Sequence, residues 1–289
     1  MITTFETNKV YLTKGMTYNL YADATRHLLD VMHCCEIEWE LLPNTSSPLH
    51  IWARDYMPIL VSREKFVRFC YSPDYLKDSP EYKPDTSAIL SELGIQVIDS
   101  DIIIDGGNVI SCGDKVIMTD KIIRENPHYQ RNKLIDTLSQ LLKAEIILIP
   151  EDRYDEYGHA DGMVRYIGNG SVLLNNYYDF DKTLRKKLLA ALNPHFDIVE
   201  LHYGAYTEKS WAYLNFLHVG QHVFVPMQED RLAVIAFKQI AEAFPKCECH
   251  QVDGCDSIVR DGGALNCCTW NIMTTVDTYD DNKEDGLAI

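Results

Sequence analysis

The stretch that decides the fold runs from residue 116 to residue 149: VIMT at 116–119, NKLIDTLSQLLKA at 132–144 and EIILI at 145–149. The first and last segments are short and apolar with β-branched residues, which is typical of buried strands. The middle segment repeats leucines at helical spacing and predicts an amphipathic helix. We therefore expect a strand, a helix and a second strand in this order.

The same order recurs about every fifty residues, the kind of period that indicates a repeat architecture. The other copies are helix 18–32 with strand 36–42; strand 66–71, helix 86–93 and strand 95–98; strand 171–174, helix 182–192 and strand 196–201; and strand 222–225, helix 229–244 and strand 247–252. Five units fill the chain with no Pro/Gly/Ser-rich linker between them. We predict a single α/β domain over residues 1–289 rather than two separate domains.

Polar segments follow the last strand of every unit. In chain order they are Trp52-Ala53-Arg54-Asp55, Asp105-Gly106-Gly107-Asn108, Gly158-His159-Ala160-Asp161, Ser210 to Asn215, and Gly262-Gly263-Ala264-Leu265-Asn266-Cys267-Cys268-Thr269. If the units pack around a pseudosymmetry axis, these equivalent loops converge at one end, where scaffold loops tend to carry function. We expect a single site there, with residues 210–215 as part of its wall.

The composition is that of a globular protein with a substantial core, with 46% hydrophobic and 24% charged residues. No apolar stretch approaches the roughly 18 residues of a membrane span, and Met1 to Glu6 lacks the basic and then apolar order of a signal peptide. We expect a cytoplasmic protein. The formal charge of −16 disfavours nucleic acid and anionic membranes as partners and is compatible with a cationic substrate.

The nine cysteines are expected to be reduced thiols, because the start of the chain shows no export signal. Their odd number also argues against complete pairing within the chain. Cys34-Cys35 and Cys247-Glu248-Cys249 each lack a second ligand pair at the spacing of a metal site. We interpret these four cysteines as small apolar residues on strands and expect no metal site.

Cys267 follows the glycine pair, and a thiol delivered beside such a loop is a candidate nucleophile. On an extended strand, the adjacent Cys268 would point to the opposite face, so that one thiol is active and the other buried. His159 and Asp161, two residues apart, share a face of an extended segment. Other interpretations stay open: both cysteines also fit a core, His159 a surface loop, and Asp55 and Asp105 simple turns.

This set of residue types suits attack on a guanidinium carbon. Paired carboxylates can hold the planar cation bidentately and orient its carbon toward a thiolate. The positive substrate would also favour ionisation of the cysteine. His159 could protonate the departing ammonia and then deprotonate water, which hydrolyses a covalent thiouronium-type intermediate.

Together these segments resemble the guanidino-group-modifying (pentein) superfamily, in the branch shared by agmatine deiminases and bacterial peptidylarginine deiminases. The matching motifs are Trp-x-Arg-Asp at 52–55, Asp-Gly-Gly-Asn at 105–108, Gly-His-x-Asp with a following arginine at 158–165, Tyr-Leu-Asn-Phe at 213–216 and Gly-Gly-x-x-x-Cys-x-Thr at 262–269. The resemblance covers nearly the whole chain. It implies a fivefold pseudosymmetric α/β propeller of ββαβ-type units, with a cysteine hydrolase site at its centre and no metal or organic cofactor.

The resemblance also assigns roles by position. Cys267 is the nucleophile and His159 the general acid and base, while Asp105 stands where the carboxylate is usually a glutamate. Asp55 and Asp161 are the carboxylates that bind the guanidinium. The other residues expected beside the substrate are Trp52, Arg54 and Asn108.

Besides Asp105, four positions depart from the pattern of the branch: Met57 replaces a glycine, Asn266 replaces the histidine before the cysteine, and Trp270-Asn271 replace a glutamine-rich ending. We expect a hydrolase that releases ammonia and a ureido product, with agmatine as the leading substrate. The pathway that we expect it to serve is putrescine biosynthesis. A homodimer is an open possibility.

Alternatives remain. The same chemistry could act on free or peptidyl arginine, or transfer the amidino group to an amine. A lapsed enzyme could bind cationic ligands through Asp55 and Asp161 without turnover. A metal hydrolase could use His159, Asp161 and a cysteine.

Overall fold

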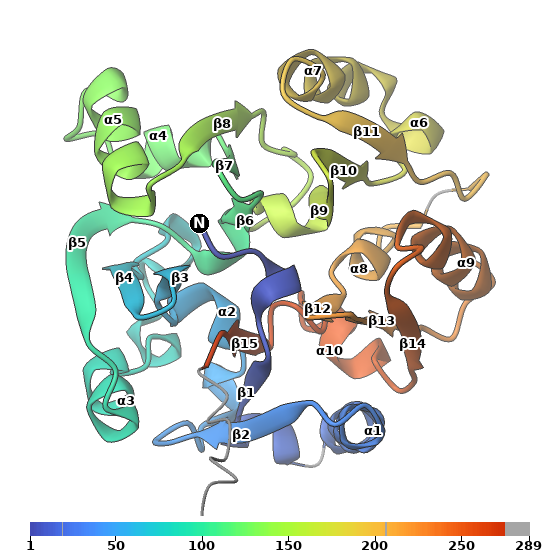
Figure 1. Cartoon of the computed structure of the whole chain (residues 1–289), viewed down its shortest axis with the longest axis horizontal. Helices are drawn as coiled ribbons and strands as arrows, with labels where there is room; N and C mark the ends of the chain where they lie inside the picture. Colours follow the sequence, from blue (N-terminus) through green and yellow to red (C-terminus); the bar gives the residue numbers. More distant parts are fainter. Residues whose placement is uncertain (19, 206, 275–289) are drawn as a thin grey trace, which may run out of the picture.

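The computed structural model of the chain describes residues 1–18, 20–205 and 207–274. In this part, the strands form five three-stranded sheets, arranged around a common centre in Figure 1. The sheets are, in hydrogen-bonded order, β15 (Thr269–Ile272), β1 (Lys9–Thr13) and β2 (Glu38–Leu42); β3 (Ile59–Ser62), β4 (Lys65–Cys70) and β5 (Val97–Ile103); β6 (Ile110–Ser111), β7 (Lys115–Thr119) and β8 (Glu145–Ile149); β9 (Val164–Gly168), β10 (Ser171–Leu174) and β11 (Asp197–Glu200); and β12 (Leu217–Val219), β13 (His222–Pro226) and β14 (Glu248–Val252). The predicted fivefold propeller of α/β units is confirmed.

The helices divide into long ones on the outside of the ring and short ones in the connections (Figure 1). The long helices are α1 (Ala22–Cys34), α3 (Thr86–Leu93), α5 (Arg131–Leu142), α7 (Lys182–Leu192) and α9 (Ala233–Ala243). The short helices are α2 (Ala53–Tyr56), α4 (Lys121–Glu125), α6 (Tyr177–Phe180), α8 (Trp211–Leu214) and α10 (Asp256–Arg260), and the 3₁₀ turns are η1 (Thr4–Glu6), η2 (Lys14–Thr17), η3 (Pro48–His50), η4 (Asp74–Leu76), η5 (Pro80–Tyr82), η6 (Gly106–Asn108) and η7 (Ala160–Gly162).

Each sheet combines one antiparallel and one parallel strand pair. In the third sheet, Ile117 of β7 lies opposite Ile110 of the antiparallel β6 and opposite Ile147 of the parallel β8. A parallel pair needs a crossover connection, which α5 provides between β7 and β8. The strand–helix–strand pattern of the sequence therefore corresponds to the two parallel strands of each sheet and the helix that connects them. It does not reveal the antiparallel first strand, which has as few as two residues in β6.

The long helices bury one leucine stripe against the sheets. Leu134, Leu138 and Leu142 of α5 are fully buried and share a core with Val67 of β4 and Met118 of β7. Because these residues recur every four positions, they lie on one helix face. The helix contacts β8 of its own sheet, and the core that it covers continues into the neighbouring sheet.

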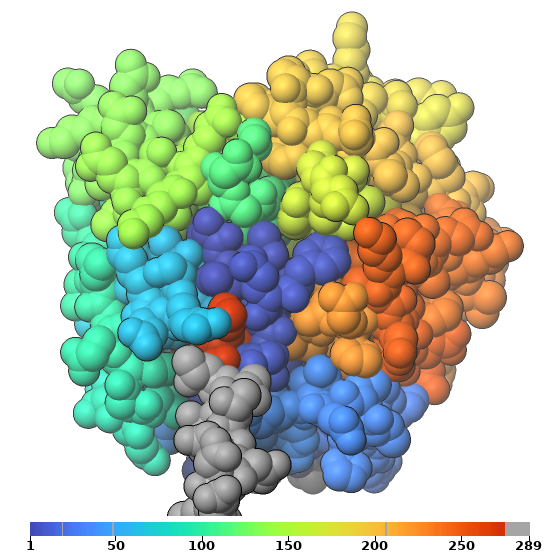
Figure 2. All heavy atoms as spheres, viewed as in Figure 1, coloured from blue at the N-terminus to red at the C-terminus, as the bar shows by residue number. Residues whose placement is uncertain are grey.

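The ring is closed by the two ends of the described chain. β15, near the C-terminal end, pairs antiparallel with β1, so that Lys9 lies opposite Ile272. This pairing makes the first sheet a composite of both ends. The N-terminal residues, dark blue in Figure 2, lie in the middle of the face shown there.

Most predicted elements are confirmed, several with shifted ends. Helices 86–93 and 182–192 and strand 145–149 agree with the structure, whereas helix 18–32 corresponds to α1 at 22–34. The predicted helix 229–244 begins later, with α9 at Ala233. The Asp230 carboxylate accepts the backbone N–H groups of Leu232 and Ala233, at 2.6 and 3.0 Å, and so holds residues 230–233 in a turn that precedes the helix. Residues 275–289 of the predicted domain lie outside the described residues.

The expectation that four cysteines lie on strands is wrong for three of them. Cys34 is the last residue of α1 and Cys35 follows it, while Cys247 precedes β14. Only Cys249 is within a strand, β14. Among the described helices, none has the length and apolar character needed to cross a membrane.

Candidate active site

Connecting segments between the five sheets meet at the centre of the ring, as the sequence predicts. Each runs from the last strand of one sheet to the first strand of the next, and the first four contain α2, η6, η7 and α8. Contacts link α2 to η6, η6 to η7, and η7 to α8. The fifth segment ends in the Cys267 loop. The equivalent loops therefore come together although they are far apart in the sequence.

The Cys267 loop is a turn rather than the extended strand that the sequence suggests. The N–H of Cys268 donates to the carbonyl of Ala264 at 3.2 Å, and the N–H of Cys267 donates to the Asn215 side chain at 3.2 Å. The backbone carbonyl of Cys267 accepts the N–H of Arg54 at 3.0 Å. Of the two thiols, Cys267 lines a pocket, whereas Cys268 is fully buried in an apolar core.

The glycine pair before this loop lets two aromatic side chains approach the backbone. Gly262 has a φ of +98°, and a Cβ there would lie 2.3 Å from the hydroxyl of Tyr157. At Gly263 a Cβ would lie 2.1 Å from the ring of Trp52. Side chains at these positions would push Tyr157 and Trp52 away, which explains why the chain needs two glycines here.

His159 is held by a buried charge network. Its Nε2 lies 2.7 Å from Oδ2 of Asp105, and the same oxygen accepts a bond of 2.5 Å from the ammonium of Lys121. The ammonium also lies 3.4 Å from Glu125. All four side chains are buried, so each charge depends on its neighbours for compensation. Asp105 consequently anchors His159 and neutralises Lys121.

Two further carboxylates face the imidazole and the thiol. Oδ1 of Asp55 lies 3.7 Å from Nδ1 of His159 and accepts the N–H of Gly107 at 3.0 Å. Oδ2 of Asp161 lies 3.5 Å from the Cys267 sulfur and accepts the side-chain N–H of Asn266 at 2.7 Å. The four groups therefore surround one small region beside η6.

This region opens into a pocket of about 360 Å³. Cys267, His159 and Asp55 are at its polar end, and the rest of its wall is largely aromatic. The aromatic residues are Trp52, Tyr56, Tyr71, Tyr75, Tyr82 and Tyr157. Aromatic faces attract cations, so such a wall beside two carboxylates favours a positively charged ligand. The lining also contains the exposed acidic residues Glu156 and Asp261, but no Lys or Arg.

Arg54 and Asn108 differ from their expected place beside the substrate. The Arg54 guanidinium donates to the Asn266 carbonyl and, at 2.5 Å, to the Asn271 side chain, and it faces a cavity of about 80 Å³ next to the N-terminal residues. The Asn108 side-chain oxygen accepts the N–H of Thr119 at 2.9 Å. Both residues therefore hold the loops together, and neither lines the pocket.

The pKa values of the charged groups follow from this arrangement. Burial opposes protonation of His159, but the negative charges of Asp55 and Asp105 outweigh it and raise the pKa to about 9. Burial raises the pKa of Asp55 to about 7, an effect that the positive charge of His159 reduces and the neighbouring carboxylates increase. For Asp105, burial is outweighed by His159 and Lys121, which lower its pKa. The imidazole is therefore protonated at neutral pH.

The pKa of the Cys267 thiol is raised well above its usual value. Burial is the main cause, and the negative charges of Asp161 and Asp55 add to it. The backbone N–H of Ala264 and the Asn215 side chain act in the opposite direction. The thiol of the free protein is therefore un-ionised, and a cation placed between these carboxylates would remove much of the opposition to ionisation.

A family model described as Porphyromonas-type peptidyl-arginine deiminase matches residues 1–272. The chain belongs to this family. The resemblance seen in the sequence is confirmed.

Solved structures share the fold at low identity. C. jejuni agmatine deiminase matches with a TM-score of 0.75 and 17% identity, over 94% of this chain and 95% of that one. Enterococcus faecalis agmatine deiminase matches with a TM-score of 0.74 and 16% identity over 96% of both chains. An amidinotransferase of saxitoxin biosynthesis from Microseira wollei matches with a TM-score of 0.64 and 12% identity, over 96% of this chain and 97% of that one. No curated protein matches the chain by sequence.

Apart from Asp105, the departures from the family pattern fall in three places, and one of them, Asn271, accepts a hydrogen bond from Arg54 beside the small cavity. Met57 and Trp270 belong to one apolar core, where the Trp270 indole donates to the Pro58 carbonyl at 2.9 Å. These two substitutions therefore change the packing and not the pocket. Asn266 is different, because its side chain bonds to Asp161 beside the thiol.

Sequence reasoning missed Lys121 and most of the aromatic wall. Lys121 begins α4, where an isolated lysine looks like an ordinary surface residue. The tyrosines of residues 71–82 belong to a Pro- and Ser-containing connection without periodicity. Their only signal is their number, since 17 tyrosines is a large share of an aromatic content of 10%.

Proposed function

We propose that this family member is a cysteine-dependent hydrolase that deiminates a guanidino compound, with agmatine as the leading substrate. The observation that carries the proposal is the pocket in which the Cys267 thiol and the His159 imidazole meet beside Asp55 and Asp161. Membership of the deiminase family supports the same chemistry.

Binding would prepare the nucleophile. A guanidinium held by Asp55 and Asp161 can donate bidentate hydrogen bonds to the carboxylates only in its own plane, which orients its carbon toward the Cys267 sulfur. The same cation compensates the two negative charges that help to raise the thiol pKa. We infer that the thiol ionises mainly when substrate is bound, so that the reactive thiolate is formed where it is needed.

The chemical steps then use the protonated His159. The thiolate attacks the guanidinium carbon, and His159 donates its proton to the departing ammonia, which leaves an S-alkylthiouronium on Cys267. The now neutral imidazole takes a proton from water, whose oxygen attacks the same carbon and displaces the sulfur. The products are ammonia and a ureido compound. In this scheme Asp105 positions and charges His159 rather than binding the guanidinium.

The charge pattern of the pocket favours agmatine over free arginine. Agmatine carries an amine at the end opposite to its guanidinium, whereas arginine also carries a carboxylate there. The described lining offers Glu156 and Asp261 and no Lys or Arg. An ammonium would be attracted to this rim and a carboxylate repelled.

A substrate panel tests the proposal: agmatine, butylguanidine as its analogue without the amine, free arginine and an arginine-containing peptide. We expect ammonia and ureido product fastest from agmatine, with kcat/KM lower for butylguanidine and lowest for arginine. The Glu156→Gln variant should lower kcat/KM for agmatine and leave that for butylguanidine unchanged. A preference for arginine or the peptide would contradict the substrate assignment.

The nucleophile is tested by a matched pair of variants. Cys267→Ala should abolish turnover, whereas Cys268→Ala should retain it, because the Cys268 sulfur lies in the core. The reverse result would overturn the assignment. Calorimetric binding of agmatine without turnover by the wild type would favour the lapsed binding protein, and loss of turnover on chelation would favour the metal hydrolase. The cytoplasmic location, a role in putrescine biosynthesis and a homodimer stay predictions, the last of which sedimentation measurements would test.

A further inference from the structure

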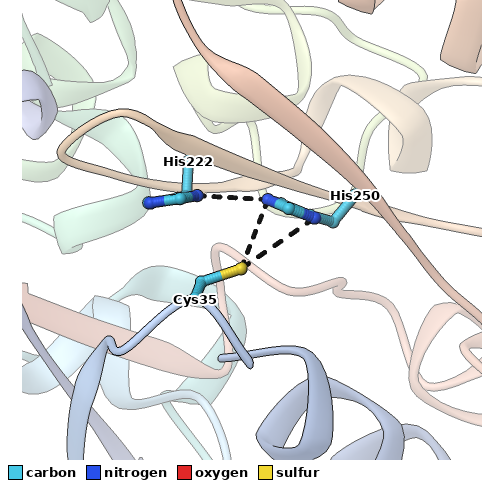
Figure 3. A group of neighbouring side chains, drawn as sticks. All are labelled: Cys35, His222 and His250. Atoms are coloured by element: carbon cyan, nitrogen blue, oxygen red, sulfur yellow. Dashed lines mark hydrogen bonds between the residues drawn. The ribbon is translucent and has the colours of Figure 1, made fainter. Parts of the chain in front are cut away.

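Three potential metal ligands lie together outside the pocket: Cys35, His222 and His250 (Figure 3). Nδ1 of His222 lies 3.1 Å from Nε2 of His250, and the Cys35 sulfur lies 3.4 Å from the same Nε2. One ligand atom from each residue lies within 4.8 Å of the other two. Among the described residues, no other group of three His, Cys, Asp or Glu side chains meets this condition.

The fold explains how the three side chains meet. His222 begins β13 and pairs with Glu248 of the parallel β14, while Phe224 pairs with His250. Residues two apart share a face of a strand, so both histidines project from the same side of the sheet. Helix α1 packs against β14 and delivers Cys35 just beyond its last residue.

Neighbouring groups support the imidazoles. The ring of Phe224 stacks on His250 with a centroid distance of 5.2 Å and an interplanar angle of 24°, which restricts the orientation of this imidazole. The Glu248 carboxylate lies 3.9 Å from Nδ1 of His222 and supplies negative charge beside the group. All three candidate ligands are partly buried, so the group is both shielded and reachable from solvent.

Two of the three ligand separations match a small tetrahedral ion, and the third is within 4.8 Å. Zn²⁺ binds imidazole nitrogen at about 2.0–2.1 Å and thiolate sulfur at about 2.3 Å. Tetrahedral angles then place two nitrogens roughly 3.3 Å apart and a nitrogen and a sulfur roughly 3.6 Å apart. The observed separations of 3.1 and 3.4 Å are each about 0.2 Å shorter. A mixed set of one sulfur and two nitrogens is also the donor chemistry that zinc prefers.

We propose that Cys35, His222 and His250 bind Zn²⁺, with the fourth position open to water or to the Glu248 carboxylate. On binding, the Cys35 thiol gives up its proton and the sulfur bonds to the metal as a thiolate. The ion would join α1 of the first unit to β13 and β14 of the fifth. None of its ligands lines the substrate pocket, so the ion is structural and independent of the deiminase chemistry.

Zinc binding to the purified full chain tests this proposal directly. After removal of metal with a chelator, calorimetric titration with zinc chloride should give one site per chain, and Co²⁺ should give the charge-transfer band of a cobalt–thiolate bond. Cys35→Ser and His250→Gln should each weaken zinc binding at least about 100-fold and remove that band, since even changes behind a ligand cost 10- to 100-fold. Zinc should also raise the Tm of the wild type but not that of these variants.

Cys34→Ser is the matched control, because Cys34 is the exposed neighbour of Cys35 and belongs to no ligand group. It should bind zinc like the wild type. If Cys35→Ser fails to fold, His222→Gln provides the same test from the other side. Absence of a stoichiometric site in the wild type, or equal loss of affinity in Cys34→Ser, would overturn the proposal. Because the readout is metal binding, its failure is independent of any failure of the deiminase.

Discussion

Replacing Asp105 by asparagine should shift the protonation of His159. Asp105 contacts the imidazole at 2.7 Å and Lys121 at 2.5 Å. Asp105→Asn keeps the size of the side chain but removes its charge. The variant also leaves the Lys121 ammonium without its nearest carboxylate, and that positive charge lowers the pKa of His159. Both changes act in the same direction, toward a more weakly basic imidazole.

The size of the effect follows from the charges around the ring. The pKa of His159 rises from 6.5 to about 9, and at about 1.4 kcal/mol per unit this corresponds to roughly 3 kcal/mol in favour of the imidazolium. The charge of Asp55 is the largest single cause that raises this pKa, and it remains in the variant. A carboxylate in direct contact accounts for about 1–3 units in such settings. We therefore expect the pKa to fall by about 1–2 units, to roughly 7–8.

Two measurements report this shift. NMR titration of the histidine ring protons gives the pKa in the free protein, and the alkaline limb of kcat/KM gives it through turnover. In the wild type, the pKa from NMR and the midpoint of the alkaline limb should both lie near pH 9, where His159 loses its proton. In Asp105→Asn both should move to lower pH, with reduced kcat/KM above pH 8 and a smaller loss at pH 6.

Two further variants control the interpretation. Asp155→Asn changes a carboxylate that accepts the backbone N–H groups of Tyr157 and His159, at 3.1 and 3.3 Å, and does not bond to the imidazole, so it should move the pKa of His159 by less than Asp105→Asn does. The double variant Asp105→Asn/Lys121→Met removes the uncompensated ammonium and should recover part of the shift. If the pKa stays near 9 in Asp105→Asn, or moves equally in Asp155→Asn, the proposed charge network is not what tunes His159.

Three other predictions follow from the same structure. The stability of the fold should decline with rising pH, because the raised pKa of His159 contributes up to roughly 3 kcal/mol that is fully present below pH 6.5 and lost as the pH passes 9. The Tm of the wild type should therefore fall between pH 7 and 9.5, and this fall should disappear in His159→Gln. A fall of equal size in His159→Gln would contradict the prediction. Gly263→Ala should destabilise the fold by about 1–3 kcal/mol, because the added Cβ meets the Trp52 ring at 2.1 Å. In urea unfolding, the double variant with Trp52→Ala should regain part of the lost stability. If it does not, the backbone conformation of Gly263, and not the Trp52 ring, causes the loss. Leu138→Ala should cost about 2–5 kcal/mol in urea unfolding, since Leu138 is 0% exposed, whereas the exposed control Gln140→Ala should stay within about 0.5 kcal/mol.

The sequence predicted most of the repeating architecture because apolar periodicity is a local property. The leucine stripe of α5 and the apolar strands β7 and β8 are visible in about thirty consecutive residues. Of the predicted site residues, Cys267, His159 and Asp55 line one pocket, Asp105 contacts His159 and Asp161 contacts Cys267, while their catalytic and binding roles stay predictions. Motif order carried this information, since each motif follows the last strand of a unit.

Other features were beyond the sequence because they depend on contacts between distant segments. Arg54 and Asp55 are adjacent, yet one faces the small cavity and the other the pocket. Likewise, Asn266 lines the small cavity and Cys267 lines the pocket. No periodicity reveals which of two neighbours a loop turns inward, so Arg54 was expected beside the substrate.

By itself, the sequence determined the five α/β units, the order of the polar loops and the candidate nucleophile, because propensity, apolar spacing and glycine positions act within short segments. Only the tertiary structure decided the closing of the ring by β15 and β1, the burial of Lys121 against Asp105 and the meeting of Cys35 with His222 and His250. These outcomes depend on which surfaces pack together. The protonation states at the site depend on them in turn, since burial and charge act through space and not along the chain.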